Sequence, residues 1–193
     1  MNLRKIIKNR KTKPIFHHYG KITDASVQLL KDSFVTVPES LLNAKELRDE
    51  YDVDKQRDDY DKHLSKYHQH DIQYKLDEDE NIEENYKHLD EKFRTVYDEL
   101  SYMLGSPIYR LRYATIEEDD SLGFHIDQPT FDRFVMVVEG EHLAIIKTDD
   151  DTYSQLMKPG EVWYMNTNWK HKVVNTSEKK RIALLGCFTK NTS

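Results

Sequence analysis

Three residues in the last third of the sequence carry side chains that bind metal ions: His125 and Asp127 within Gly-Phe-His-Ile-Asp, and His171 within Asn-Trp-Lys-His-Lys. Two imidazoles and one carboxylate can hold one face of a non-haem Fe(II) ion and leave its other positions open. Arg181 lies ten residues beyond His171, at the start of an apolar segment, and a buried guanidinium requires an anion. The pattern therefore indicates iron-dependent oxygen chemistry.

The His-x-Asp spacing alone is weak evidence. The chain has nine histidines and 35 acidic residues, so such a pair arises by chance, and His88-Leu89-Asp90 is a second copy. That copy lies in a Glu/Lys-rich stretch with helical periodicity, residues 86–98, and no histidine and arginine follow it at strand spacing. We interpret it as a solvated helix face.

The surroundings of His125 differ, because they alternate with the period of a strand. His125 and Asp127 fall on one side of an extended chain, and Phe124 and Ile126 fall on the other. We expect a strand over residues 122–127, with Phe124 and Ile126 packed into the protein and the two polar residues facing a cavity. A helix would point residues two apart about 200° away from each other.

Length and composition limit the alternatives. A chain of 193 residues fits one domain, 1–193, with a sizeable core. The net charge is −6 with scattered basic residues, which argues against a nucleic-acid partner, and no apolar run is long enough to cross a membrane. The basic run 1–13 predicts a surface strand or tail. Cys187 is the single cysteine, which favours a reducing compartment and a cytoplasmic location.

The texture of the chain changes near Gly105. Before it, residues 24–34 and 81–104 have helical spacing, and Gly105 is a signal for the end of the second helix. The charged stretch 45–80 predicts a solvated helix or an excursion from the fold. Its tyrosines, Tyr60 and Tyr67 among them, could instead cover the mouth of a cavity.

After Gly105 the sequence becomes rich in β-branched and aromatic residues, in short runs separated by turn signals. We predict an α+β, mainly β fold: a double-stranded β-helix (jelly-roll, cupin-like) core over 105–193, with residues 1–104 forming a mostly helical layer and a charged insertion. The predicted strands are 108–117, 122–127, 133–139, 142–148, 152–157, 162–166, 171–175 and 181–188.

Several motifs in this order resemble a known family, the aspartyl/asparaginyl β-hydroxylase-like branch of the Fe(II)/2-oxoglutarate-dependent oxygenases, which also contains bacterial hydroxylases of free proline. The resemblance covers residues 109–188. It runs through Tyr-Arg-Leu-Arg-Tyr at 109–113, the His-Ile-Asp, Arg133, Lys-Pro-Gly-Glu-Val-Trp-Tyr-Met-Asn at 158–166, His-Lys-Val-Val-Asn at 171–175, and Arg181.

This resemblance implies that His125, Asp127 and His171 bind Fe(II) and that Arg181 holds the distal carboxylate of 2-oxoglutarate. It also implies that O2 is consumed, that succinate and carbon dioxide are released, and that an amino acid, free or in a peptide, is hydroxylated. The sequence departs from the family after Arg133, because Val135 stands where a histidine is common. Arg133 is therefore either a second cosubstrate-binding residue or a plain surface ion-pair partner.

Several alternatives remain open at this stage. His171 could be a capped strand start, and Arg181 could be a sheet-edge cation. His125 and Asp127 could form a structural hydrogen-bonded pair. The fold could be a binding module that holds a metal or a small ligand without turnover, although such a module has no need of Arg181. A related oxygenase could use the same iron to desaturate its substrate. The sequence is silent on the oligomeric state.

Overall fold

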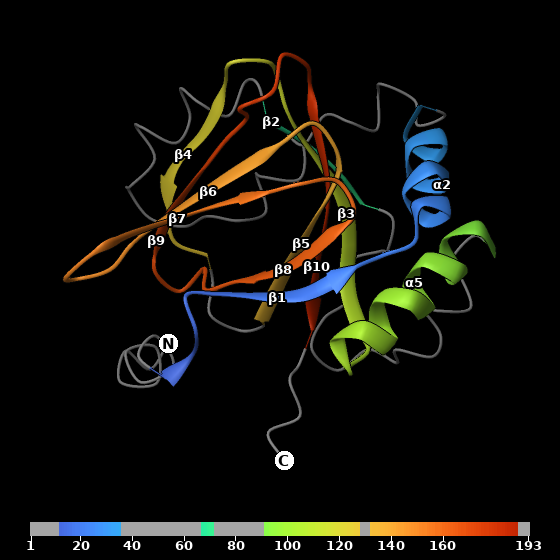
Figure 1. The fold of residues 1–193 in the computed structure, drawn as a ribbon, viewed down its shortest axis with the longest axis horizontal. Coiled ribbons are helices and arrows are strands. Elements are labelled where there is room, and N and C mark those ends of the chain that lie inside the picture. Colours follow the sequence, from blue (N-terminus) through green and yellow to red (C-terminus); the bar gives the residue numbers. More distant parts are fainter. Residues whose placement is uncertain (1–11, 36–66, 72–90, 128–131, 189–193) are drawn as a thin grey trace.

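The computed structural model of this protein describes residues 12–35, 67–71, 91–127 and 132–188, and ten strands and two helices are assigned within them (Figure 1). In chain order these are β1 (Phe16–Lys21), α2 (Asp24–Val35), β2 (Tyr67–Asp71), α5 (Glu91–Leu104), β3 (Ile108–Ile116), β4 (Ser121–His125), β5 (Asp132–Glu139), β6 (His142–Lys147), β7 (Thr152–Met157), β8 (Glu161–Met165), β9 (Lys170–Val174) and β10 (Arg181–Phe188).

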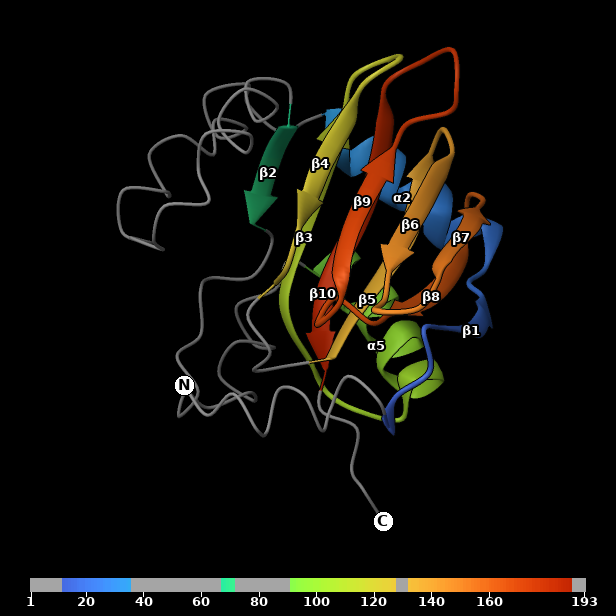
Figure 2. The same cartoon turned by 90° about the vertical axis from the view of Figure 1, so that its left-hand side faces the viewer.

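The strands form two antiparallel sheets. The larger sheet has the order β1-β8-β5-β10-β3-β2, and the smaller one has the order β4-β9-β6-β7. From β3 onward the chain passes back and forth between the sheets, which is the connectivity of a jelly roll. The predicted jelly-roll core is confirmed. Figure 2 shows β4, β9 and β6 side by side as one layer, with the larger sheet and the helices beyond it.

Two apolar layers hold this architecture together. One lies between the larger sheet and the helices, and it includes Leu30 of α2, Leu100 of α5 and Phe188 of β10. The other lies between the two sheets, and it includes Ala144 of β6 and Ala183 of β10. Both faces of β10 are therefore buried, which explains its nearly continuous apolar sequence. The helices cover one sheet, as predicted.

The helix ends follow from local sequence. Thr23 caps α2, because its Oγ1 accepts a hydrogen bond from the Ser26 amide at 3.2 Å. Helix α5 ends at Gly105, which has φ of +63°, and the amides of Gly105 and Ser106 donate back to the carbonyls of Tyr102 and Ser101. This is a Schellman motif, and it confirms the C-terminal signal predicted at Gly105.

Two edge strands were not predicted. β1 pairs with β8, and β2 pairs with β3, so they extend the larger sheet at its two edges. The expected helix over 45–80 is wrong for residues 67–71, because their backbone pairs with β3 as strand β2. Residues 1–11, the rest of 45–80, the start of the helix expected over 81–104, and the His88-Leu89-Asp90 copy lie outside the described residues.

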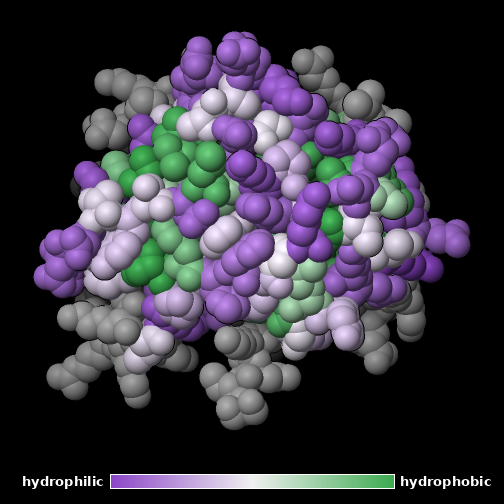
Figure 3. Space-filling view, in the orientation of Figure 1, coloured by the Kyte–Doolittle hydropathy of each residue, from purple (hydrophilic) through white to green (hydrophobic). Residues whose placement is uncertain are grey.

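The visible surface is mostly hydrophilic, with hydrophobic residues in small separated groups (Figure 3). This agrees with the 33% of charged residues in the sequence. Among the described residues, no helix is long and apolar enough to cross a membrane.

Candidate functional site

The two histidines and the aspartate singled out in the sequence lie together between the sheets. His125 ends β4, His171 lies on β9, and Asp127 follows β4 by two residues. One ligand atom from each side chain can be chosen such that all three lie within 4.8 Å of one another. The Asp127 carboxylate oxygens lie 3.7 Å from Nε2 of His125 and 3.6 Å from Nε2 of His171. This arrangement could hold one metal ion.

Both imidazole rings are oriented in the same way by the backbone. Nδ1 of His125 lies 2.8 Å from the carbonyl oxygen of Gly123, and Nδ1 of His171 lies 3.0 Å from that of Trp169. A carbonyl oxygen can only accept a hydrogen bond, so each Nδ1 carries the proton and donates it. Each Nε2 then keeps its lone pair and points toward Asp127. Metal-binding histidines are commonly fixed in this way by a hydrogen bond from the other ring nitrogen.

An irregularity in β4 makes this convergence possible. Leu122 is opposite Val173 and His125 is opposite His171, so β4 contains one more residue than β9 over the same length. In a regular strand, residues three apart point to opposite faces, but the bulge lets both Leu122 and His125 face the smaller sheet's inner side. Leu122 packs there with Ile116 and Val173.

The expectation that Phe124 and Ile126 pack into the protein is wrong. Phe124 is on the face opposite His125, where the Lys147 ammonium lies 4.5 Å from its ring centroid, and Ile126 is 48% exposed. β4 also ends at His125, so Asp127 is not part of the strand. The chain turns toward the β8–β9 loop instead, where the Asp127 amide donates to the carbonyl of Thr167 at 3.1 Å.

Asp127 carries a stable negative charge in this environment. Burial acts to raise the pKa of its carboxyl group, but the charges of Arg133, His171, His125 and Arg112 outweigh burial and hold the pKa well below the usual range. Arg133 makes the closest of these contacts, with Nη1 3.1 Å from Oδ2. The Asp127 side chain is therefore a negatively charged carboxylate, the form that binds a metal ion, at any pH near neutrality.

His171 is more deeply buried than His125, with 2% of its surface exposed. Burial lowers its pKa to about 4, although the neighbouring Asp127 carboxylate acts in the opposite direction. The ring is neutral near pH 7, and a neutral imidazole is the form that binds a metal ion.

The structure places both predicted arginines on the inner side of the larger sheet. Arg133 of β5 lies beside the triad and is 23% exposed, and its partner is Asp127. Arg181 opens β10, is 1% exposed, and shares a strand face with Ala183 of the inter-sheet layer. Two cations of different depth therefore flank the space between the sheets.

A buried histidine nearby was missed by the sequence reasoning. His142 opens β6 and is 2% exposed. Burial and the charge of Arg181, followed by that of His171, lower its pKa well below the ordinary value. A signal for it exists in the sequence, because His142, Ala144 and Ile146 alternate with the residues that face outward, and Ala144 and Ile146 are core residues.

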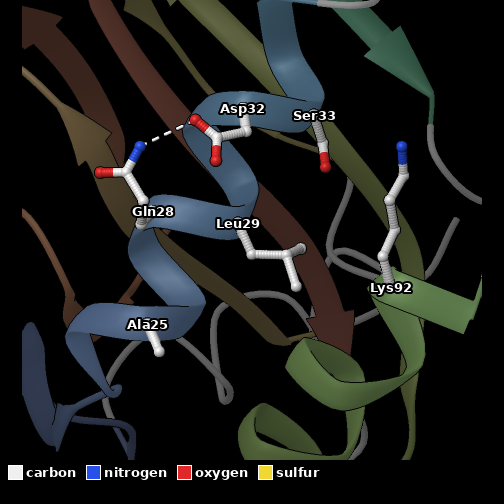
Figure 4. Close-up of a pocket in the computed structure, with 6 residues that line it drawn as sticks. All are labelled: Ala25, Gln28, Leu29, Asp32, Ser33 and Lys92. Atoms are coloured by element: carbon white, nitrogen blue, oxygen red, sulfur yellow. Dashed lines mark hydrogen bonds between the residues drawn. The ribbon is translucent and has the colours of Figure 1, made fainter.

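The helical layer carries a separate hollow that does not share this chemistry. A pocket of about 620 Å³ is lined by five residues of α2 and by Lys92 of α5 (Figure 4). Its polar side chains partly satisfy each other, since Gln28 donates to Asp32 at 2.8 Å. It lies on the far side of the larger sheet from the triad, and among its described lining residues Asp32 alone carries a carboxylate, with no histidine or cysteine beside it.

Comparison with solved structures finds distant similarity to several proteins. A 2OG-Fe(II) oxygenase family oxidoreductase from Burkholderia pseudomallei is 15% identical, with a TM-score of 0.45, over 67% of this chain and 71% of that one. An oxalate oxidase is 15% identical, with a TM-score of 0.41, over 66% and 53%. The cupin domain of Drosophila melanogaster CENP-C is 10% identical, with a TM-score of 0.36, over 39% and 57%.

This chain spans about half the length of the first solved structures that it matches. A search of the curated proteins finds no matching sequence. The family models give a clearer result, because the model described as aspartyl/asparaginyl beta-hydroxylase matches residues 42–190, which is most of the chain and includes every residue of the site. The chain belongs to the aspartyl/asparaginyl β-hydroxylase family.

Proposed function

We propose that this protein is an Fe(II)- and 2-oxoglutarate-dependent hydroxylase and that His125, Asp127 and His171 bind the iron. One observation carries the proposal: one ligand atom from each of His125, Asp127 and His171 lies within 4.8 Å of the other two, and each Nδ1 is hydrogen-bonded to a backbone carbonyl. The donor set fits Fe(II), since two neutral imidazoles and one carboxylate are the ligands of non-haem iron oxygenases.

In this proposal the chain supplies three metal-binding side chains whose orientations are set by the fold. His125 and His171 present lone pairs whose direction is set by the backbone of Gly123 and Trp169. Asp127 supplies the negative charge, and the Arg133 guanidinium lies 3.1 Å from its carboxylate and holds it in place. The burial of His171 would keep water away from its side of the site.

Arg181 has the second role in the proposal, which is to bind the distal carboxylate of 2-oxoglutarate. A guanidinium binds a carboxylate with two parallel hydrogen bonds, and a site with 1% exposure makes each of them strong. Arg133 already has Asp127 as a partner, so we assign it primarily to positioning the aspartate and only secondarily to the cosubstrate.

When bound, iron and 2-oxoglutarate supply the oxidation: one atom of O2 enters the cosubstrate, which loses CO2 and becomes succinate, and the other is inserted into a C–H bond of the substrate. The family description names aspartyl and asparaginyl residues. We propose an amino acid, free or within a peptide, as the substrate of this chain.

Anaerobic titration with Fe(II) tests the proposal. Addition of 2-oxoglutarate should produce a visible charge-transfer band that Fe(II) alone does not give, and Arg181→Ala should weaken it. Aerobic turnover should release succinate and add one oxygen to a substrate, whereas loss of two hydrogens would mean desaturation. Well-folded protein that gives no band would favour a binding module without turnover.

We also propose that the helices and the jelly roll form a single domain, because residues of α2, α5 and the larger sheet share one continuous apolar core. The single cysteine, Cys187, is buried and has no cysteine partner in the sequence. It fits a reducing compartment, and we propose the cytoplasm.

A further inference from the structure

His142 has a buried imidazole ring whose nitrogen atoms make no hydrogen bond within the described residues. Within the part of the chain that the structure describes, neither Nδ1 nor Nε2 has a hydrogen-bond partner, and the residue is 2% exposed. Buried polar groups are nearly always hydrogen-bonded, and each exception requires an explanation. A leucine has a similar size and would fill the same space, and its burial would not strip water from a polar group. The ring therefore indicates a hydrogen-bond partner that is supplied by a bound ligand and not by the chain.

The position of His142 along β6 separates it from the triad. Its inward neighbours along β6 are Ala144 and Ile146, and Ile146 is opposite His171 in the β6–β9 register. Four residues of strand separate His142 from Ile146, which is about 13 Å. His142 therefore lies at a different depth from the triad, and it cannot be a further ligand of the same metal ion.

Arg181 lies at the same end of the inter-sheet space. The residue opposite His142 on β7 is Met157, which packs in the same layer as Ala183, the next inward residue after Arg181 on β10. The β5–β6 turn that leads into His142 touches Arg181 directly, since a Cβ on Gly140 would lie 3.1 Å from the Arg181 Cα. The positive charge of Arg181 contributes to lowering the pKa of the His142 imidazole.

The chemistry of the two side chains is complementary toward an anion. Arginine offers only donors, and a neutral imidazole offers one N–H donor and one acceptor. A cation beside a buried imidazole keeps that imidazole neutral, so His142 adds a donor without adding a second positive charge. A carboxylate that enters beside Arg181 can then receive hydrogen bonds from both side chains.

We propose that His142 is a second binding residue for the distal carboxylate of the 2-oxo acid cosubstrate, donating a ring N–H to it beside Arg181. This inference rests on the proposed function. It explains why an imidazole occupies a position that alternates with core residues, and it makes recognition of the distal carboxylate depend on two strands of different sheets, β6 and β10.

The test is calorimetric binding of two acids to Zn(II)-loaded protein, which does not react with O2. 2-Oxoglutarate has the distal carboxylate, and 2-oxobutyrate lacks it. His142→Leu should weaken binding of 2-oxoglutarate by about tenfold to a hundredfold, the effect of one hydrogen bond to a charged group, and should leave 2-oxobutyrate unchanged. His142→Gln keeps a donor and should recover part of the loss.

Met157→Leu is the matched control, because it changes packing next to His142 without removing a hydrogen bond, and both acids should bind it as they bind the wild type. Zn(II) affinity, measured for each variant, checks that the triad is intact. Equal binding of 2-oxoglutarate by His142→Leu and wild type would overturn the inference alone, as would equal weakening of both acids. Wild-type protein that binds no Zn(II) or no 2-oxoglutarate would overturn the proposed function as well.

Discussion

His125 and His171 are opposite each other in the β4–β9 register, and each donates from Nδ1 to the carbonyl oxygen two residues earlier in its own sequence. The ring centroids lie 4.2 Å apart. The same local arrangement therefore occurs twice, on neighbouring strands, and it depends only on backbone atoms. Both ring orientations are fixed by the fold before any metal ion arrives.

The first prediction concerns this pair. His171→Ala should lower the affinity for Fe(II) or Zn(II) by more than the 10- to 100-fold that follows loss of a group merely supporting a ligand. Isothermal titration of metal into the apo protein measures it. His17→Ala removes an exposed histidine of β1 and should leave the affinity unchanged. Equal affinities for the two variants would remove His171 from the site.

A second prediction concerns the Arg133–Asp127 ion pair. Arg133→Met leaves the carboxylate in a partly buried place with less compensation, so the apo protein should lose about 1–3 kcal/mol of unfolding free energy. The pair is 23% and 19% exposed. Lys179→Met breaks the more exposed pair with Glu139 and should cost less than about 1 kcal/mol. Urea denaturation at pH 7 compares them, and equal losses would contradict the prediction.

Two glycines with left-handed backbones give a third prediction. Gly140 has φ of +75°, and a Cβ there would lie 2.7 Å from Ser177 Oγ and 3.1 Å from the Arg181 Cα, whereas Gly105 has φ of +63° and open space around it. Gly105→Ala should lower stability by about 1 kcal/mol through backbone strain alone. Gly140→Ala should lower it further and should also weaken binding of 2-oxoglutarate, because it displaces Arg181.

Thermal unfolding and cosubstrate titration of both variants separate these effects. Unchanged 2-oxoglutarate affinity in a folded Gly140→Ala protein would show that the position of the β5–β6 turn does not control Arg181.

The fourth prediction concerns pH. His142 is neutral in the folded protein because burial and Arg181 lower its pKa, whereas in the unfolded chain it takes up a proton near pH 6.5. Below that pH the unfolded state binds more protons, so stability falls as the pH decreases, by about 1.4 kcal/mol per unit at most. Denaturation of the apo protein between pH 7 and 5.5 should show a shallower fall for His142→Leu. Parallel curves would contradict it.

The wild-type slope contains a second contribution of the same sign. His171 has a folded pKa of about 4, also below its unfolded value, so stability that is complete above pH 6.5 decreases as the pH falls toward 4. This contribution should persist in His142→Leu.

The sequence was sufficient for the regular parts of this architecture. Alternation located the eight jelly-roll strands to within two residues at each end, and the glycine at 105 predicted the end of α5. These features depend on local backbone preferences and on the two-residue period of buried strands. The edge strands β1 and β2 carry no comparable pattern in the sequence, and each pairs with one strand in the described sheets.

The sequence identified the candidate residues of the site but not their detailed arrangement. The types and order of His125, Asp127 and His171 were enough to bring them together as candidates. Phe124 does lie opposite His125, but on the outer face of the smaller sheet and not in the core. The bulge that puts both Leu122 and His125 on the inner face leaves no trace in the alternation, because a single extra residue changes which side chains face inward. His142 has the same inward orientation as Ala144 and Ile146, but the sequence alone does not distinguish a functional histidine at such a position from one that only packs in the core.

β10 pairs with β3 on one side and with β5 on the other, although more than 60 residues lie between β3 and β10. Contacts between distant parts of a chain form slowly, because a long loop must close first. During synthesis β3 and β5 lack the strand that lies between them in the larger sheet until β10 leaves the ribosome. We therefore expect the nascent chain to need protection from aggregation, and to acquire the Arg181 side of its cavity last.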